Sequence, residues 1–257
     1  MATNRWSREQ LIVAFGLYCQ LPFGRMHKSN PDIVKTARLI GRTPSSLAMK
    51  LVNFASLDPA ITSTGRKGLG NASSDDRKVW DEFHADWESL ALQSANIFGA
   101  LDVKFAKTKK SEEDVSDIEN FAADGKKAWV EVRTKQDFFR RAVINSYKSR
   151  CCMSGLEVPM LLIASHIVPW KIDPSNRLNP RNGLCLSALH DRAFDKGLVT
   201  VTTDLRIKVS KLLKKIQSDK FLTSSLIRLD GNNLLLPEKF FPDPGFLAFH
   251  VKNIFKG

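Results

Sequence analysis

Two histidines and one asparagine lie within 25 residues of one another, each at the edge of an apolar segment. His166 follows the apolar residues 161–164, Asn182 precedes the apolar residues 183–186, and His190 lies just beyond them. A neutral imidazole can take a proton from water near pH 7 or bind a metal ion. Hydrolysis of a phosphodiester requires both an activated water and charge stabilisation at the phosphoryl oxygens. The three residues therefore point to hydrolytic chemistry.

The elements that must position these residues can be predicted from the local pattern. Residues 161–164 are typical of a short buried strand that ends at His166, and residues 183–186 indicate a second strand. Pro169 and Pro174 predict a loop between the strands, and a helix that starts near Ser187 would carry His190. The expected order is strand, loop, strand and helix.

Several further motifs surround the two histidines in a fixed order. They are Tyr147, Arg150, Cys152 and Ser154-Gly155, then ASHIVPW at 164–170, RLNPRNGL at 177–184 and HDRAFDKGL at 190–198. With these motifs, residues 137–210 resemble an HNH endonuclease domain of the ββα-metal type found in restriction-associated nucleases. The resemblance implies a C-terminal nuclease domain that cuts double-stranded DNA.

The resemblance also implies a role for each central residue. His166 would be the general base, Asn182 would order the loop between the strands, and His190 would bind a divalent metal ion. Ser165 departs from the family, because many members have Asp or His there as a ligand. We expect Asp195 to replace it, with water in the remaining positions of Mg²⁺. Mn²⁺, Ni²⁺ and Zn²⁺ are the alternatives to Mg²⁺.

The charge balance agrees with a polyanionic partner. The chain of 257 residues has 39 Lys and Arg against 27 Asp and Glu, a net charge of +12, with a pI near 9.6. Charge alone does not choose between DNA, RNA and an anionic membrane.

The sequence contains no run of 18 apolar residues, so we expect no transmembrane helix. Residues 1–10 are polar and lack the basic and then apolar segments of a signal peptide, so we expect a cytoplasmic protein. The four cysteines form no CxxC pair, which favours free buried thiols and leaves open a zinc site that includes a histidine.

The N-terminal half carries a second motif. Residues 31–40 and 44–54 both show helical spacing of apolar residues, and Gly41 and Thr43 separate the two predicted helices. The pair resembles a helix-turn-helix, although helical hairpins that bind nothing look alike. We expect the exposed face of the second helix to contact DNA through Ser45, Ser46, Lys50 and Asn53.

Other predicted elements complete the chain. Ser7 is expected to cap a first helix, residues 77–92 indicate an amphipathic helix, and a helix from residue 136 would present Arg140 and Arg141 either to phosphates or only to solvent. Residues 198–201 and 207–209 predict a hairpin, residues 234–236 a short strand, and residues 246–250 a helix.

Together these patterns predict an α+β protein with a mainly helical domain at 1–103, a charged linker at 104–135 and an HNH nuclease domain at 136–257. The first hypothesis for function is a metal-dependent DNA endonuclease of restriction or defence, for which a twofold dimer is the simplest route to a double-strand cut. The alternative is a DNA-binding regulator whose HNH fold is catalytically silent.

Overall fold

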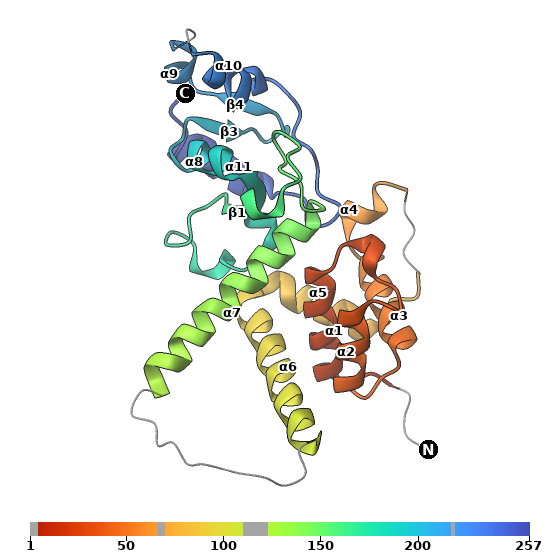
Figure 1. Ribbon diagram of the computed structural model, residues 1–257. Coiled ribbons are helices and arrows are strands. Elements are labelled where there is room, and N and C mark those ends of the chain that lie inside the picture. The colour runs from red at the N-terminus through yellow and green to blue at the C-terminus, as the bar shows by residue number, and fades with distance from the viewer. Residues whose placement is uncertain (1–4, 66–69, 110–122, 217–218) are drawn as a thin grey trace. The chain divides into compact units, whose positions relative to one another are not determined.

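The structure, a computed structural model, describes residues 5–65, 70–109, 123–216 and 219–257. The chain divides into two compact units, residues 1–138 and 139–257. In the described parts, the first unit contains helices without strands, and the second combines helices with two antiparallel two-stranded sheets (Figure 1). The protein therefore belongs to the α+β class.

The helices of the N-terminal unit begin at capping residues. Ser7, Asn30 and Thr43 each accept a hydrogen bond from a backbone N–H of the first turn, and Pro31 and Pro44 occupy first helical positions. These caps confirm the predicted starts of the first three helices. The helices are α1 Arg8–Gln20, α2 Pro31–Leu39, α3 Pro44–Ala55, α4 Pro59–Thr62, α5 Ser74–Ala85 and α6 Trp87–Lys109, with a 3-10 turn η1 at Phe23–Arg25.

The amphipathic helix predicted at residues 77–92 is in fact two helices. Asp86 lies between α5 and α6 with φ −148° and ψ 85°, outside the helical region, and its Oδ1 accepts a hydrogen bond from Ser89 N at 3.0 Å. The pattern was misleading because the apolar side chains of both helices, such as Phe83 and Trp87, pack around Phe15 of α1.

Helix α7, Ala123–Ser146, reaches both sides of the boundary between the units at residues 138 and 139. The segment expected as a charged linker, residues 104–135, includes the end of α6 and the start of α7, and residues 110–122 lie outside the described residues. The helix expected from residue 136 therefore begins earlier, at Ala123.

In the C-terminal unit, β1 Leu162–His166 pairs antiparallel with β2 Gly183–Ser187, and helix α8 Ala188–Asp195 follows directly. A second hairpin joins β3 Val199–Val201 to β4 Ile207–Val209. The order predicted around His166, Asn182 and His190 is confirmed. The other elements are α9 Lys211–Lys214, α10 Lys220–Ser225, α11 Pro244–Asn253 and the 3-10 turns η2 Pro159–Leu161, η3 Pro174–Asn176, η4 Pro180–Asn182 and η5 Ile227–Leu229.

Two C-terminal expectations have different outcomes. Residues 234–236 do not form the expected strand; the nearest pairing is an isolated bridge between Arg206 and Asn233. The helix expected at residues 246–250 is present as part of α11, where buried His250 stacks on Phe194 and contacts Thr200 Oγ1 at 2.8 Å.

Within the described ranges, none of the helices combines the length and the apolar character that crossing a bilayer requires.

Candidate active site

His166 lies at the end of β1, opposite Gly183 of β2. Its Nε2 lies 2.9 Å from the backbone oxygen of Arg177, and because a carbonyl can only accept, Nε2 carries the hydrogen. In the neutral ring, Nδ1 is then the nitrogen with a free lone pair. Burial lowers the pKa of His166 from its ordinary value, an effect that the Arg177 carbonyl partly opposes. The ring is therefore neutral at pH 7 and able to accept a proton at Nδ1.

Aromatic side chains fix the plane of the His166 ring. Phe139, on the C-terminal part of α7, stacks on it with ring centres 3.8 Å apart and planes 9° apart. Trp170 meets the ring edge-on at 5.4 Å. A Cβ atom at Gly183 would clash with Val143 of α7, so the close approach of α7 to the hairpin depends on this glycine. These contacts hold His166 in one orientation.

Asn182 organises the loop that follows His166. Its side chain is 1% exposed. Its Oδ1 accepts a hydrogen bond from Val168 N at 2.8 Å, while its Nδ2 donates to the oxygens of Val168 and Asn176, both at 3.2 Å. The backbone oxygen of Asn182 also accepts from Ile167 N at 2.9 Å. The asparagine thus bridges the two ends of the connection between β1 and β2, the arrangement that its predicted role requires.

His190 lies in the first turn of α8 and is almost fully buried. Its Nε2 lies 3.0 Å from the backbone oxygen of Ser225, and its Nδ1 lies 2.7 Å from Ser187 Oγ and 3.4 Å from Cys151 Sγ. Burial alone would lower the pKa of His190, but the contacts with Cys151 and Ser225 outweigh it and raise that pKa. Burial would raise the pKa of Cys151, but hydrogen bonds with His190 and Ser154 lower it to about 6. Both nitrogens of His190 therefore have partners within the protein.

The residues present do not assemble a metal-ligand set in this arrangement. Among the described residues, no three His, Cys, Asp or Glu side chains gather in a way that could hold a metal ion. Asp195, the expected second ligand, is exposed and lies five residues from His190, about 140° around an ideal helix. Ser165 is 3% exposed, and its Oγ has no hydrogen-bond partner within the described structure. A metal ion at His190 would have to displace the ring's present contacts.

Comparison with known proteins identifies this region. Residues 151–202 match the HNH endonuclease family. This segment is similar to an HNH endonuclease module. The match includes β1, the Asn182 loop, β2 and α8, and it covers 52 of the 257 residues. A search of curated proteins finds no match. The match therefore supports a nuclease of this class within the C-terminal unit, and the class implies DNA as the substrate.

The residues predicted to contact DNA from the N-terminal unit gather at one hollow. Ser45, Ser46, Lys50 and Asn53 line a cavity of about 370 Å³ beside Trp6. The expectation that Lys50 lies on the exposed face is wrong, because its side chain is 9% exposed and its Nζ lies 2.8 and 3.0 Å from the carboxylate oxygens of Asp76. Arg140 and Arg141 are exposed on α7 in the C-terminal unit.

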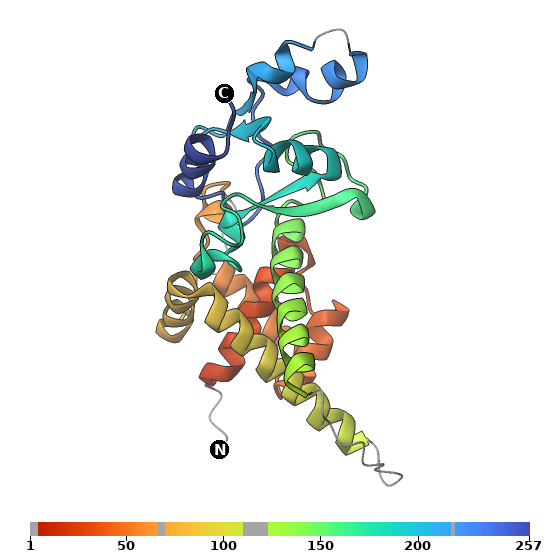
Figure 2. The same ribbon diagram turned by 90° about the vertical axis from the view of Figure 1, so that its left-hand side faces the viewer.

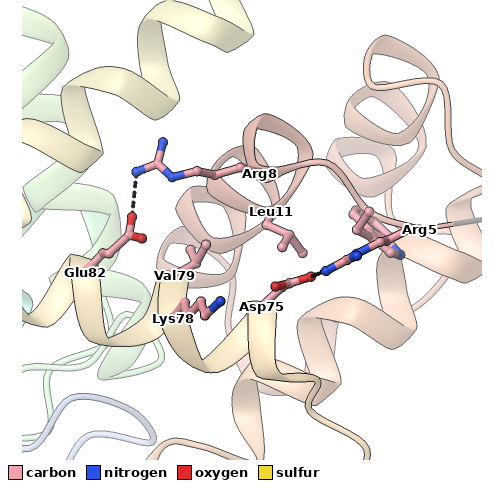
Figure 3. A pocket seen from close by; sticks show the side chains of 8 residues that line it. Arg5, Arg8, Leu11, Asp75, Lys78, Val79 and Glu82 are labelled. Atoms are coloured by element: carbon pink, nitrogen blue, oxygen red, sulfur yellow. Dashed lines mark hydrogen bonds and ion pairs between the residues drawn. The ribbon is translucent and has the colours of Figure 1, made fainter.

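A second hollow, of about 320 Å³, lies between the start of α1 and α5 (Figure 3). Figure 3 shows Arg5 and Arg8 reaching to carboxylates of α5: Arg5 to Asp75 at 2.9 Å and Arg8 to Glu82 at 2.6 Å. The Arg5 pair attaches the segment before α1 to α5, and the Arg8 pair attaches the first residue of α1 to α5. Trp6 lines both hollows and also lies under the guanidinium of Arg42 at 4.9 Å.

Sequence reasoning missed several residues that complete the site. The carbonyls of Arg177 and Ser225 orient the two histidines, and no sequence signal shows where a carbonyl points. Phe139 belongs to the helix expected from residue 136, but its stacking on His166 depends on tertiary structure. The adjacent cysteines 151 and 152 stand out in the sequence, but nothing in the sequence predicts that Cys151 lies beside His190.

Proposed function

We propose that the protein is a divalent-metal-dependent DNA endonuclease in which His166 acts as the general base. The observation that supports this most directly is the hydrogen bond from His166 Nε2 to the Arg177 carbonyl, because it leaves Nδ1 as the proton acceptor. The HNH match and the net charge of +12 support a nucleic acid substrate. We further propose double-stranded DNA as the target, a role in restriction or defence, and a homodimer for double-strand cleavage.

In the proposed reaction, a water molecule bound beside His166 Nδ1 loses its proton to the ring as the water oxygen attacks the phosphorus. The bond between phosphorus and the 3′ oxygen breaks, and that oxygen leaves and takes its proton from solvent water. Stacking on Phe139 and the Arg177 carbonyl keep the ring in place while it gains a positive charge. Asn182 keeps residues 167 and 168 against the end of β2, which maintains the loop from which the Arg177 carbonyl projects. Ser45, Ser46 and Asn53 are proposed DNA contacts of the α2–α3 pair as a helix-turn-helix, and Arg140 and Arg141 are proposed phosphate contacts.

The test compares the parent with His166→Ala on supercoiled plasmid, with Mg²⁺, Mn²⁺, Ni²⁺ or Zn²⁺ and with a chelator. Parent cleavage should require an added ion, and the variant should be slower by about 10²- to 10⁴-fold. His27→Ala is the control, because His27 is exposed and contacts only Ser29 through its ring. Because burial lowers the pKa of His166, the fall in parent activity with acidification should begin at a lower pH than for a histidine with an ordinary pKa.

A second candidate is a DNA-binding regulator with a catalytically silent HNH module. The observation that favours it is the state of His190, whose nitrogens both have protein partners, together with the absence of a ligand set among the described residues. If the parent binds DNA but cuts it with none of the four ions, the regulator is correct and the endonuclease is refuted. Cleavage that His166→Ala retains at the parent rate would refute the assignment of the base.

A further inference from the structure

Helices α9 and α10 follow the second hairpin and lie outside the segment that matches the HNH family. Figure 2 shows them in blue beyond the strands of this unit. Three large apolar side chains within ten residues are exposed here: Leu212 by 50%, Ile216 by 51% and Phe221 by 69%. Leu212 lies on α9 and Ile216 lies two residues beyond its end, whereas Leu213 points into the core with 8% exposure. A single exposed leucine is ordinary, but such a group indicates a binding surface.

The same segment is strongly basic. Residues 206–230 contain seven Lys and Arg but only two Asp. One carboxylate, Asp230, pairs with Lys214 at the base of the segment, and the other, Asp219, caps α10 through Leu222 N. Lys211, Lys215 and Lys220 are exposed. Exposed lysines and exposed apolar residues therefore alternate along this segment.

We propose that this surface, made of Lys211, Leu212, Lys215, Ile216, Lys220 and Phe221, is a second DNA-contacting element of the nuclease. The proposal rests on the proposed function, since it takes DNA as the substrate. The lysines contact phosphates, and Phe221 is placed against the bases of the minor groove, where apolar side chains can enter between base steps. A second copy of the chain fits less well, because pairing two such surfaces would bring like charges together.

The surface is connected to the HNH module through its backbone. Ser225, the last residue of α10, holds His190 Nε2 with its carbonyl, and Asp230 Oδ1 accepts from Val209 N at 2.7 Å. A DNA duplex held on α10 therefore lies on an element that directly orients a histidine of the HNH module. This connection explains why an element outside the matched segment would contribute to nuclease function.

The experiment measures binding of the full chain to an end-labelled 30-base-pair duplex at several salt concentrations, with His166→Ala in all proteins to prevent cleavage. Lys211→Ala/Lys215→Ala should weaken binding about 10-fold and lower the slope of log affinity against log salt by about 2, since each phosphate contact contributes about 0.9. Phe221→Ala should weaken binding about 10-fold, leave the salt slope unchanged, and reduce the DNA bend reported by energy transfer between the labelled ends. Met160→Ala is the matched control, because Met160 is 93% exposed on η2.

The outcomes separate this inference from the proposed function. If the background protein does not bind DNA at any salt concentration, the proposed function fails. If it binds, but the lysine and Phe221 variants keep its affinity, slope and bend, the second DNA element is refuted. The inference is also overturned if the variants change the mass measured by light scattering, or the binding to anionic phospholipid vesicles, while DNA affinity stays the same. Loss of affinity in the Met160→Ala control as well would refute the assignment to this surface.

Discussion

Replacing Asn182 tests whether this residue positions the general base. Asn182→Ala removes one acceptor and two donor interactions. It leaves Val168 N and Val168 O without that partner, while Asn176 O keeps its hydrogen bond from Asn179 N. An unpaired buried polar group costs about 1–3 kcal/mol. Val168 is 4% exposed, whereas Asn176 is partly exposed and can turn to water. We therefore expect a loss of about 3 kcal/mol in the free energy of unfolding of the C-terminal unit.

For a unit of this size, that loss lowers the melting temperature by about 10 °C in calorimetry. Cleavage should fall by roughly 10²-fold below the melting temperature, because a displaced loop moves the Arg177 carbonyl away from His166 Nε2. Asn182→Asp should be no better than the alanine variant, since it places a carboxylate oxygen against two carbonyl oxygens. Asn179→Ala is the control, because among the described residues its side chain bonds to Arg181 N and Asn176 Oδ1, both within the same turn.

Three results would refute this reasoning about Asn182. An alanine variant that melts at the parent temperature would show that the three hydrogen bonds do not support the loop. A variant that melts normally but loses cleavage would show that Asn182 contacts the substrate instead of positioning the base. Equal effects of the Asn179 and Asn182 variants would mean that the turn as a whole matters, and not the bridge to Val168.

The remaining predictions concern buried ionisable groups. Burial lowers the pKa of His250 from 6.5 to about 4. The unfolded state therefore binds a proton more readily than the folded state between these two pH values. The free energy of unfolding should be highest above pH 6.5 and fall by about 3 kcal/mol as the pH falls to about 4. Urea unfolding at pH 7 and 4.5 should show this loss in the parent but not in His250→Gln; an equal loss in both contradicts it. Lys50→Ala should destabilise the N-terminal unit by about 3 kcal/mol in thermal unfolding, because it leaves Asp76 buried without its cation, whereas exposed Lys78→Ala should have little effect. A Lys50→Ala protein as stable as Lys78→Ala would refute this account.

The local elements around the HNH module could be predicted because their signals are local. Apolar runs bounded by prolines and glycine predict β1 and β2. Ser187 caps α8 because its Oγ accepts a hydrogen bond from His190 N. Helical spacing, in contrast, gave one helix where Asp86 divides two, because spacing does not show which neighbour an apolar side chain meets. The burial of Lys50 could not be predicted from the local sequence either, because its partner Asp76 lies 26 residues away in the sequence.

The two histidines show where sequence reasoning stops. Both were singled out by residue type and spacing, yet their environments differ in the property that decides their chemistry. His166 has one nitrogen on a carbonyl and the other available, with a lowered pKa, which suits a base. His190 has partners at both nitrogens and a raised pKa. Because one of those partners is the Ser225 carbonyl at the end of α10, the proposed binding of an ion at His190 would depend on an element outside the matched segment. Mutations in α9 and α10 should therefore affect the cation requirement of cleavage as well as DNA affinity.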